Sequence, residues 1–127
     1  MVKKEMKPAW NLGTLFLVRI NNLFKYLDNA SVRVNSGQLA YLPYYYAILL
    51  QIYNTMKPYI SEERREKIDF LFRCYLIASS LGKILLAVNL LNKIQDELND
   101  EFATNEFFVK LSEKITFEDI QKILIRK

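Results

Sequence analysis

Histidine is absent from the 127 residues, and cysteine occurs once, as Cys74. Without histidine the chain has no Ser-His-Asp or Cys-His nucleophile system, no His-ligated metal and no His general base. A single cysteine excludes Cys-rich zinc and iron–sulfur sites and any intramolecular disulfide. The commonest catalytic and metal centres are thereby excluded, and we expect neither an enzyme nor a bound cofactor.

Glycine and proline are also scarce, with three of each, so the chain has few of the residues that form tight turns. Half of the residues are apolar, a proportion typical of a helical globular chain rather than of a disordered one. A chain of this length can bury a core without disulfides or metals. We therefore expect a single domain over residues 1–127, in which residues 1–7 form a frayed basic tail.

No targeting or membrane segment stands out. The three lysines of the tail are not followed by the apolar run of a secretory signal, so a cytoplasmic location is expected. Residues 39–53 and 74–91 approach the composition of a membrane span, but the first stretch is short and the second has Lys83 near its centre. Because a lysine is costly in hydrocarbon, we interpret both stretches as buried bundle helices.

Two helices are expected in the first half of the chain. Apolar residues recur at helical spacing over residues 9–28 and again over residues 39–59. An interior proline breaks a helix, so Pro43 places the regular part of the second at 42–57, and Pro58 ends it. Residues 30–37 alternate apolar and polar side chains, which predicts a loop with a short extended piece.

The stretch 61–100 has the strongest periodicity. Ser61 can cap its first turn. Steps of four and three residues then join one continuous line, in which Gln95 is the only polar member: Phe70, Cys74, Ile77, Leu81, Ile84, Val88, Leu91, Gln95 and Leu98. This spacing predicts one long helix with a buried face, with Ile84 at its centre, or two helices joined near Ser79–Gly82, where small residues allow a break.

Two short helices follow, over residues 105–114 and 117–125, the second with Thr116 as its cap. The expected fold is all-α: an up-and-down helical bundle of three long helices, 9–28, 42–57 and 62–99, with the two short helices at the C-terminal end.

Charged residues gather in two places. We interpret the carboxylates as a solvated helix face, because the oxygen-donor loop of a calcium site is missing; they are Asp96, Glu97, Asp100, Glu101 and Glu106. Over residues 62–69 the charges alternate in sign. Glu63 with Lys67 and Arg65 with Asp69 are spaced for ion pairs along one exposed helix turn.

The apolar surface exceeds what a small bundle should bury, and this favours a protein interface. The residues predicted to form it are Tyr44, Tyr45, Ile48, Ile52, Leu86, Leu90 and Ile94. The expected function is that of a non-catalytic structural or interaction subunit, which forms a homo-oligomer or docks into a larger assembly.

Two other functions stay open. A nucleic-acid-associated subunit would contact phosphates through dispersed cations: Lys3, Lys4, Lys7, Lys122, Arg126 and Lys127. The tyrosines of residues 41–53 could stack on bases, but that window contains no Lys or Arg to hold a phosphate. A membrane-associated helical protein is the third possibility.

Overall fold

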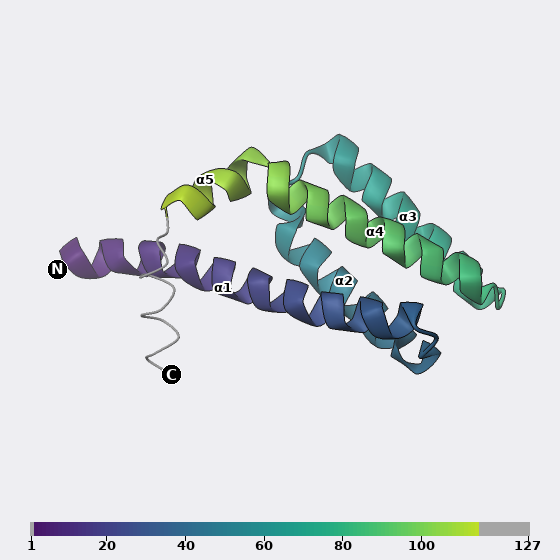
Figure 1. The fold of residues 1–127 in the computed structure, drawn as a ribbon. Helices are drawn as coiled ribbons and strands as arrows, with labels where there is room; N and C mark the ends of the chain where they lie inside the picture. Colours follow the sequence, from purple (N-terminus) through teal and green to yellow (C-terminus); the bar gives the residue numbers. More distant parts are fainter. Residues whose placement is uncertain (1, 115–127) are drawn as a thin grey trace.

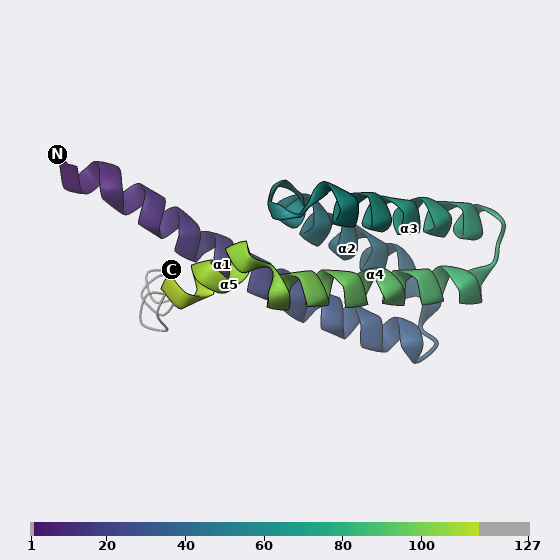
Figure 2. The ribbon, with the colours of Figure 1, turned by 90° about the horizontal axis from the view of Figure 1, so that it is seen from above.

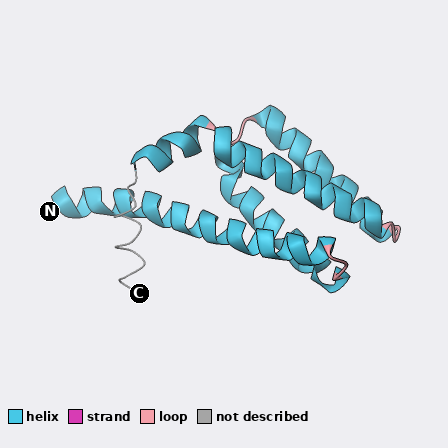
Figure 3. Ribbon diagram, in the orientation of Figure 1, coloured by secondary structure: helices cyan, strands magenta, loops and turns pink. Residues whose placement is uncertain are grey.

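The computed structural model describes residues 2–114, and describes residues 2–12, 14 and 114 by their backbone only. These residues are all-α, with no strand among them (Figures 1 and 3). The helices are α1 (Val2–Asn35), α2 (Leu42–Met56), α3 (Glu62–Ser80), α4 (Ile84–Thr104) and α5 (Glu106–Lys114), and two short 3-10 turns, η1 (Leu39–Tyr41) and η2 (Lys57–Tyr59), flank α2. The short helix expected over residues 117–125 and its cap Thr116 lie outside the described residues.

The first helix is longer than the sequence suggested. Residues 2–7 are helical rather than frayed, and residues 30–35 continue the helix instead of forming an extended loop. Packing explains the extension over residues 30–35, because Leu27, Ala30 and Val34 follow one another at helical spacing and are all buried. Gly37, with φ of 94°, ends the helix, because the amide of Gln38 then reaches back to the carbonyl oxygen of Arg33 at 2.9 Å.

The prolines and the serine cap act as the sequence predicts. Helix α2 begins at Leu42 with Pro43 in its first turn, and it ends at Met56, before Pro58. The amide of Arg64 donates to the Ser61 hydroxyl at 3.3 Å, so Ser61 caps α3.

The stretch 62–99 is two helices and not one, which is the second of the two alternatives that the sequence left open. Helix α3 ends at Ser80, and Gly82 has φ of 71°. The amide of Lys83 donates to the carbonyl oxygen of Ala78 at 2.9 Å, the same closure that ends α1. Helices α3 and α4 therefore form an antiparallel hairpin (Figures 1 and 2), and the described chain has four long helices where three were expected.

Helix α2 packs against α1 and α4. It also meets α3 through aromatic rings: Tyr46 stacks on Tyr75 with centroids 4.9 Å apart, and Tyr53 packs against Phe72 at 5.5 Å. A helix with neighbours on three sides buries most of its circumference.

A cluster of aromatic rings fixes α5 against α1. Phe16 of α1 packs on the fully buried Phe108 of α5 with centroids 6.0 Å apart, and Tyr59 of η2 stacks on Phe107 at 4.0 Å. Asn105 caps α5, accepting from the amide of Phe107 at 2.8 Å. The described part of the chain is thus closed at this end by aromatic contacts, at the opposite end of α4 from the Gly82 turn (Figure 1).

Candidate protein-interaction surface

The periodic apolar line divides at the Gly82 turn into an exposed half and a buried half. In α3 the exposed fractions of Phe70, Ile77 and Leu81 are 57, 61 and 66%. In α4 the residues Val88, Leu91 and Leu98 are buried. Helix α3 instead turns a different face to the bundle, formed by Ile68, Leu71, Phe72, Tyr75 and Ala78. The line in α3 is therefore an unpartnered apolar stripe.

The position of Ile84 also differs from the prediction. It was expected at the centre of a buried face, but it is the first residue of α4 and is 36% exposed. The spacing of three and four residues continues across the turn, so the pattern itself could not reveal that the two halves face different directions.

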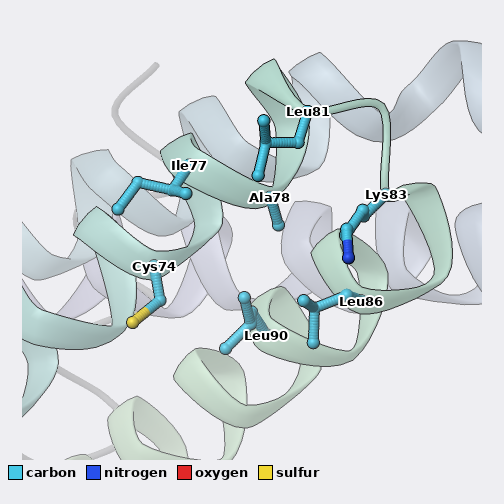
Figure 4. Close-up of a pocket in the computed structure, with 7 residues that line it drawn as sticks. All are labelled: Cys74, Ile77, Ala78, Leu81, Lys83, Leu86 and Leu90. Carbon is cyan, nitrogen blue, oxygen red and sulfur yellow. The ribbon is translucent and has the colours of Figure 1, made fainter.

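An apolar groove of about 360 Å³ lies between the end of α3 and the start of α4, and we call it the α3–α4 groove. Figure 4 shows the side chains that line it, which come from α3 and its end on one side and from the start of α4, with Leu86 and Leu90, on the other. Its lining is Cys74, Ile77, Ala78, Leu81, Lys83, Leu86 and Leu90. Because Ile77 and Leu81 belong to both features, the groove and the stripe form one surface.

From Phe70 onward, the charged side chains along α3 and the start of α4 have one sign. Residues 70–95 contain Arg73, Lys83 and Lys93 but no carboxylate, and all three cations are exposed. The groove end of the apolar surface is accordingly bordered by positive charge.

Four of the seven predicted interface residues belong to the core instead. Tyr45, Ile48 and Ile52 of α2 and Ile94 of α4 are buried, because neighbours surround α2 on three sides. Of the other three, Tyr44 and Leu86 are exposed and Leu90 is half-buried in the groove. Phe70, Ile77 and Leu81 were predicted from their spacing to lie on a buried face, but they are surface residues.

Tyr45 is buried, and its hydroxyl belongs to a hydrogen-bond network, so its ring is not exposed for stacking on a base. Its hydroxyl lies 2.9 Å from Asn92 Oδ1 and 2.5 Å from Gln95 Oε1. Burial raises the pKa of Tyr45 to about 12. Asn92 also exchanges amide hydrogen bonds with Asn35 of α1. Gln95, the one polar member of the periodic line, also donates to the carboxylate of Asp28 on α1 at 3.3 Å, so it joins α4 to α1 and α2.

The acidic cluster is partly paired rather than simply solvated, which corrects the sequence analysis. The guanidinium of Arg64 lies 3.1 Å from Glu97 and 3.1 Å from Glu101, and the latter is buried. Lys67 pairs with Glu97 at 3.0 Å. These ion pairs join α3 to α4.

The side chains predicted to form ion pairs along α3 contact other groups instead. Lys67 pairs across to α4, Arg65 donates to the carbonyl oxygen of Ile60 at 3.1 Å, and Asp69 accepts from the Tyr53 hydroxyl at 2.7 Å. Among the described residues, acidic and cysteine side chains form no group of three that could hold a metal ion.

The six cations proposed to contact phosphate are not tested. Lys3, Lys4 and Lys7 are described by their backbone only, and Lys122, Arg126 and Lys127 lie outside the described residues. Within residues 2–114, no helix combines the length and the apolar character needed to cross a bilayer. Comparison with protein-family models, with curated proteins and with solved structures finds no match to this chain.

Proposed function

We propose that this chain is a non-catalytic interaction subunit, which binds a helix of another protein chain in the α3–α4 groove and works as an up-and-down helical bundle in the cytoplasm. The observation that carries the proposal is the exposed stripe of Phe70, Ile77 and Leu81, at the spacing of a helix–helix seam. A groove between two helices is a common docking site for a third helix with apolar anchors.

The energetics favour a bound partner. Each large aliphatic or aromatic side chain removed from water contributes roughly 1.5–3 kcal/mol. Phe70, Ile77 and Leu81 of α3 and Leu86 of α4 are between 49 and 66% exposed, so covering each of them supplies about half of that free energy, which favours association. Exposed apolar patches of this kind mark interaction sites on soluble domains.

Site-specific photocrosslinking in the native host tests the proposal. A photoreactive amino acid at Leu81, on the stripe, is expected to give crosslinked adducts of discrete mass. Val32 is the matched control position, because it is an aliphatic residue on α1 with a similar exposed fraction of 64%. Discrete adducts at position 81 and none at position 32 support the interaction function. Absence of adducts at position 81 overturns it.

A further inference from the structure

The charge distribution along α3 indicates which kind of partner binds in the α3–α4 groove. The two ends of the apolar stripe carry opposite charge. Before Phe70 come the exposed carboxylates of Glu62, Glu63 and Glu66, and after Leu81 comes the exposed ammonium of Lys83.

The cations near the acidic end do not neutralise it. Arg64 and Lys67 pair with carboxylates of α4. Arg65 donates to the backbone carbonyl groups of Lys57 and Ile60. The first turns of α3 therefore present net negative charge to solvent, while the region around the end of the stripe, with Arg73 and Lys83, presents positive charge.

From this arrangement we infer that the groove is occupied by the α3 helix of a second copy of this chain, in antiparallel orientation. The inference rests on the proposed interaction function and specifies its partner. In an antiparallel seam with this spacing, Phe70 of each copy packs opposite Leu81 of the other, and Cys74 opposite Ile77. The stripe is thus complementary to itself under a two-fold axis.

The same register places opposite charges side by side. Lys83 follows the Gly82 turn, and its amide bonds back to the carbonyl oxygen of Ala78, so it stays level with the last turn of α3. In the antiparallel register that turn lies beside the one that precedes Phe70 in the second copy, where Glu66 and Glu63 lie. At about 1.5 Å of rise per residue, Lys83 and Glu66 are then within one helical turn of each other. A parallel pairing would bring like charges together, and it is disfavoured for that reason.

Cys74 lies close to the proposed two-fold axis, and it is the single cysteine of the chain. Crosslinking of the purified protein with a short bismaleimide is therefore expected to convert the 15.0 kDa chain into a species of twice that mass. The Cys74→Ser variant should give none. Sedimentation equilibrium in the micromolar range, without crosslinker, should also give the mass of a dimer.

Substitutions identify the interface. Ile77→Asp is expected to abolish the dimer, whereas Val32→Asp, at an exposed position outside the groove, should leave it intact. Both variants should keep the helical circular dichroism of the parent, since neither side chain is buried.

Charge reversal tests the orientation. Lys83→Glu and Glu66→Lys should each weaken dimerisation about tenfold, because each contact occurs twice. Combined in one chain they should restore it, since the reversed charges again face each other. A dimer that neither single variant weakens, or that the double variant fails to restore, overturns the antiparallel register.

A constant monomer mass overturns the self-association inference, and the photocrosslinking at position 81 then decides whether the interaction function survives with a different protein partner. Flotation of the monomer with anionic phospholipid vesicles, lost in Ile77→Asp, would identify the stripe as a lipid-binding surface and would also overturn the inference. Dimerisation that persists in Ile77→Asp would place the interface elsewhere on the molecule.

Discussion

The guanidinium of Arg64 on α3 lies 3.1 Å from the carboxylate of Glu101, the most deeply buried charged side chain among the described residues. The same guanidinium also pairs with Glu97 at 3.1 Å and with Asp100 at 3.2 Å. One cation on α3 thus contacts three carboxylates on α4, of which Glu97 also pairs with Lys67. Since these carboxylates crowd the C-terminal end of α4, where negative charge opposes the helix dipole, Arg64 is needed to stabilise the hairpin.

Removing Arg64 should therefore be costly. We expect Arg64→Met to lower the free energy of unfolding by about 2 kcal/mol, because it leaves the buried carboxylate of Glu101 without a cation and leaves Glu97 with Lys67 alone. Adding Glu101→Gln should recover part of the loss. The measurement is urea denaturation at one fixed protein concentration, since association would otherwise change the apparent stability.

The control for that experiment is the ion pair between Lys110 and Glu106 on α5, in which both side chains are mostly exposed. Lys110→Met should cost less than about 0.5 kcal/mol, as is usual for a surface pair. Equal small losses for the two variants would mean that the carboxylates of α4 behave as a solvated face.

Ile84 and Leu91 share the periodic line but should respond oppositely to substitution. Ile84→Asp is expected to change stability by no more than about 0.5 kcal/mol, because an acidic residue at the first position of α4 interacts favourably with the helix dipole. Leu91→Ala should cost about 3 kcal/mol, since Leu91 is fully buried in the core. Denaturation midpoints of the two variants measure this difference. A large loss in Ile84→Asp would restore the buried face expected from the sequence.

The sequence predicted well those features that depend on local chemistry. Pro43, Pro58 and Ser61 each act within one turn of their own position, through a missing amide or a hydroxyl acceptor, so the limits of α2 and the start of α3 could be read directly.

Features that depend on neighbours could not be predicted in this way. The wide apolar face of α2 suggested that some of its apolar residues form an interface with another protein. Tyr45, Ile48 and Ile52 are instead buried by contacts with surrounding helices. Conversely, the stripe in α3 looked like core because its spacing is that of a buried seam. Spacing identifies a face, and only the arrangement of helices decides what covers it.

The path of residues 30–35 was missed although a signal for it exists. Alternation of Val32 and Val34 with polar residues suggested an extended segment. The helical spacing that continues from Leu27 through Ala30 to Val34 competes with that signal, and burial favours the helix. Val32 is left exposed on the opposite side, as a helix requires.

Gly82 should be important for the hairpin of α3 and α4 because its φ of 71° is in the left-handed region. Gly82→Ala is expected to cost about 1 kcal/mol from backbone strain alone, since an added Cβ would meet no atom within 4 Å. Gly82→Asn should cost less, because asparagine tolerates this conformation better. Thermal unfolding of the two variants measures the difference. If alanine is harmless, the turn adopts another conformation in solution.

The last prediction concerns the pH dependence of stability through Tyr45. Burial raises the pKa of its phenol from 10.0 to about 12 in the folded chain. Below pH 10 the phenol is protonated in both states. Between pH 10 and 12 the unfolded chain loses this proton while the folded chain keeps it, so the free energy of unfolding should fall, by on the order of 2 kcal/mol.

Tyr45→Phe removes the titrating group, and its stability should therefore fall less steeply than that of the parent over this range. Near neutral pH the variant should itself be less stable by about 1 kcal/mol, because Asn92 and Gln95 lose the hydroxyl that contacts them. Tyr44→Phe is the matched control: Tyr44 is the exposed neighbour, and its variant should keep the slope of the parent. Urea denaturation at a series of pH values between neutrality and pH 12 measures the three slopes. Parallel curves for the parent and Tyr45→Phe would show that the phenol of Tyr45 does not titrate differently in the folded and unfolded chains.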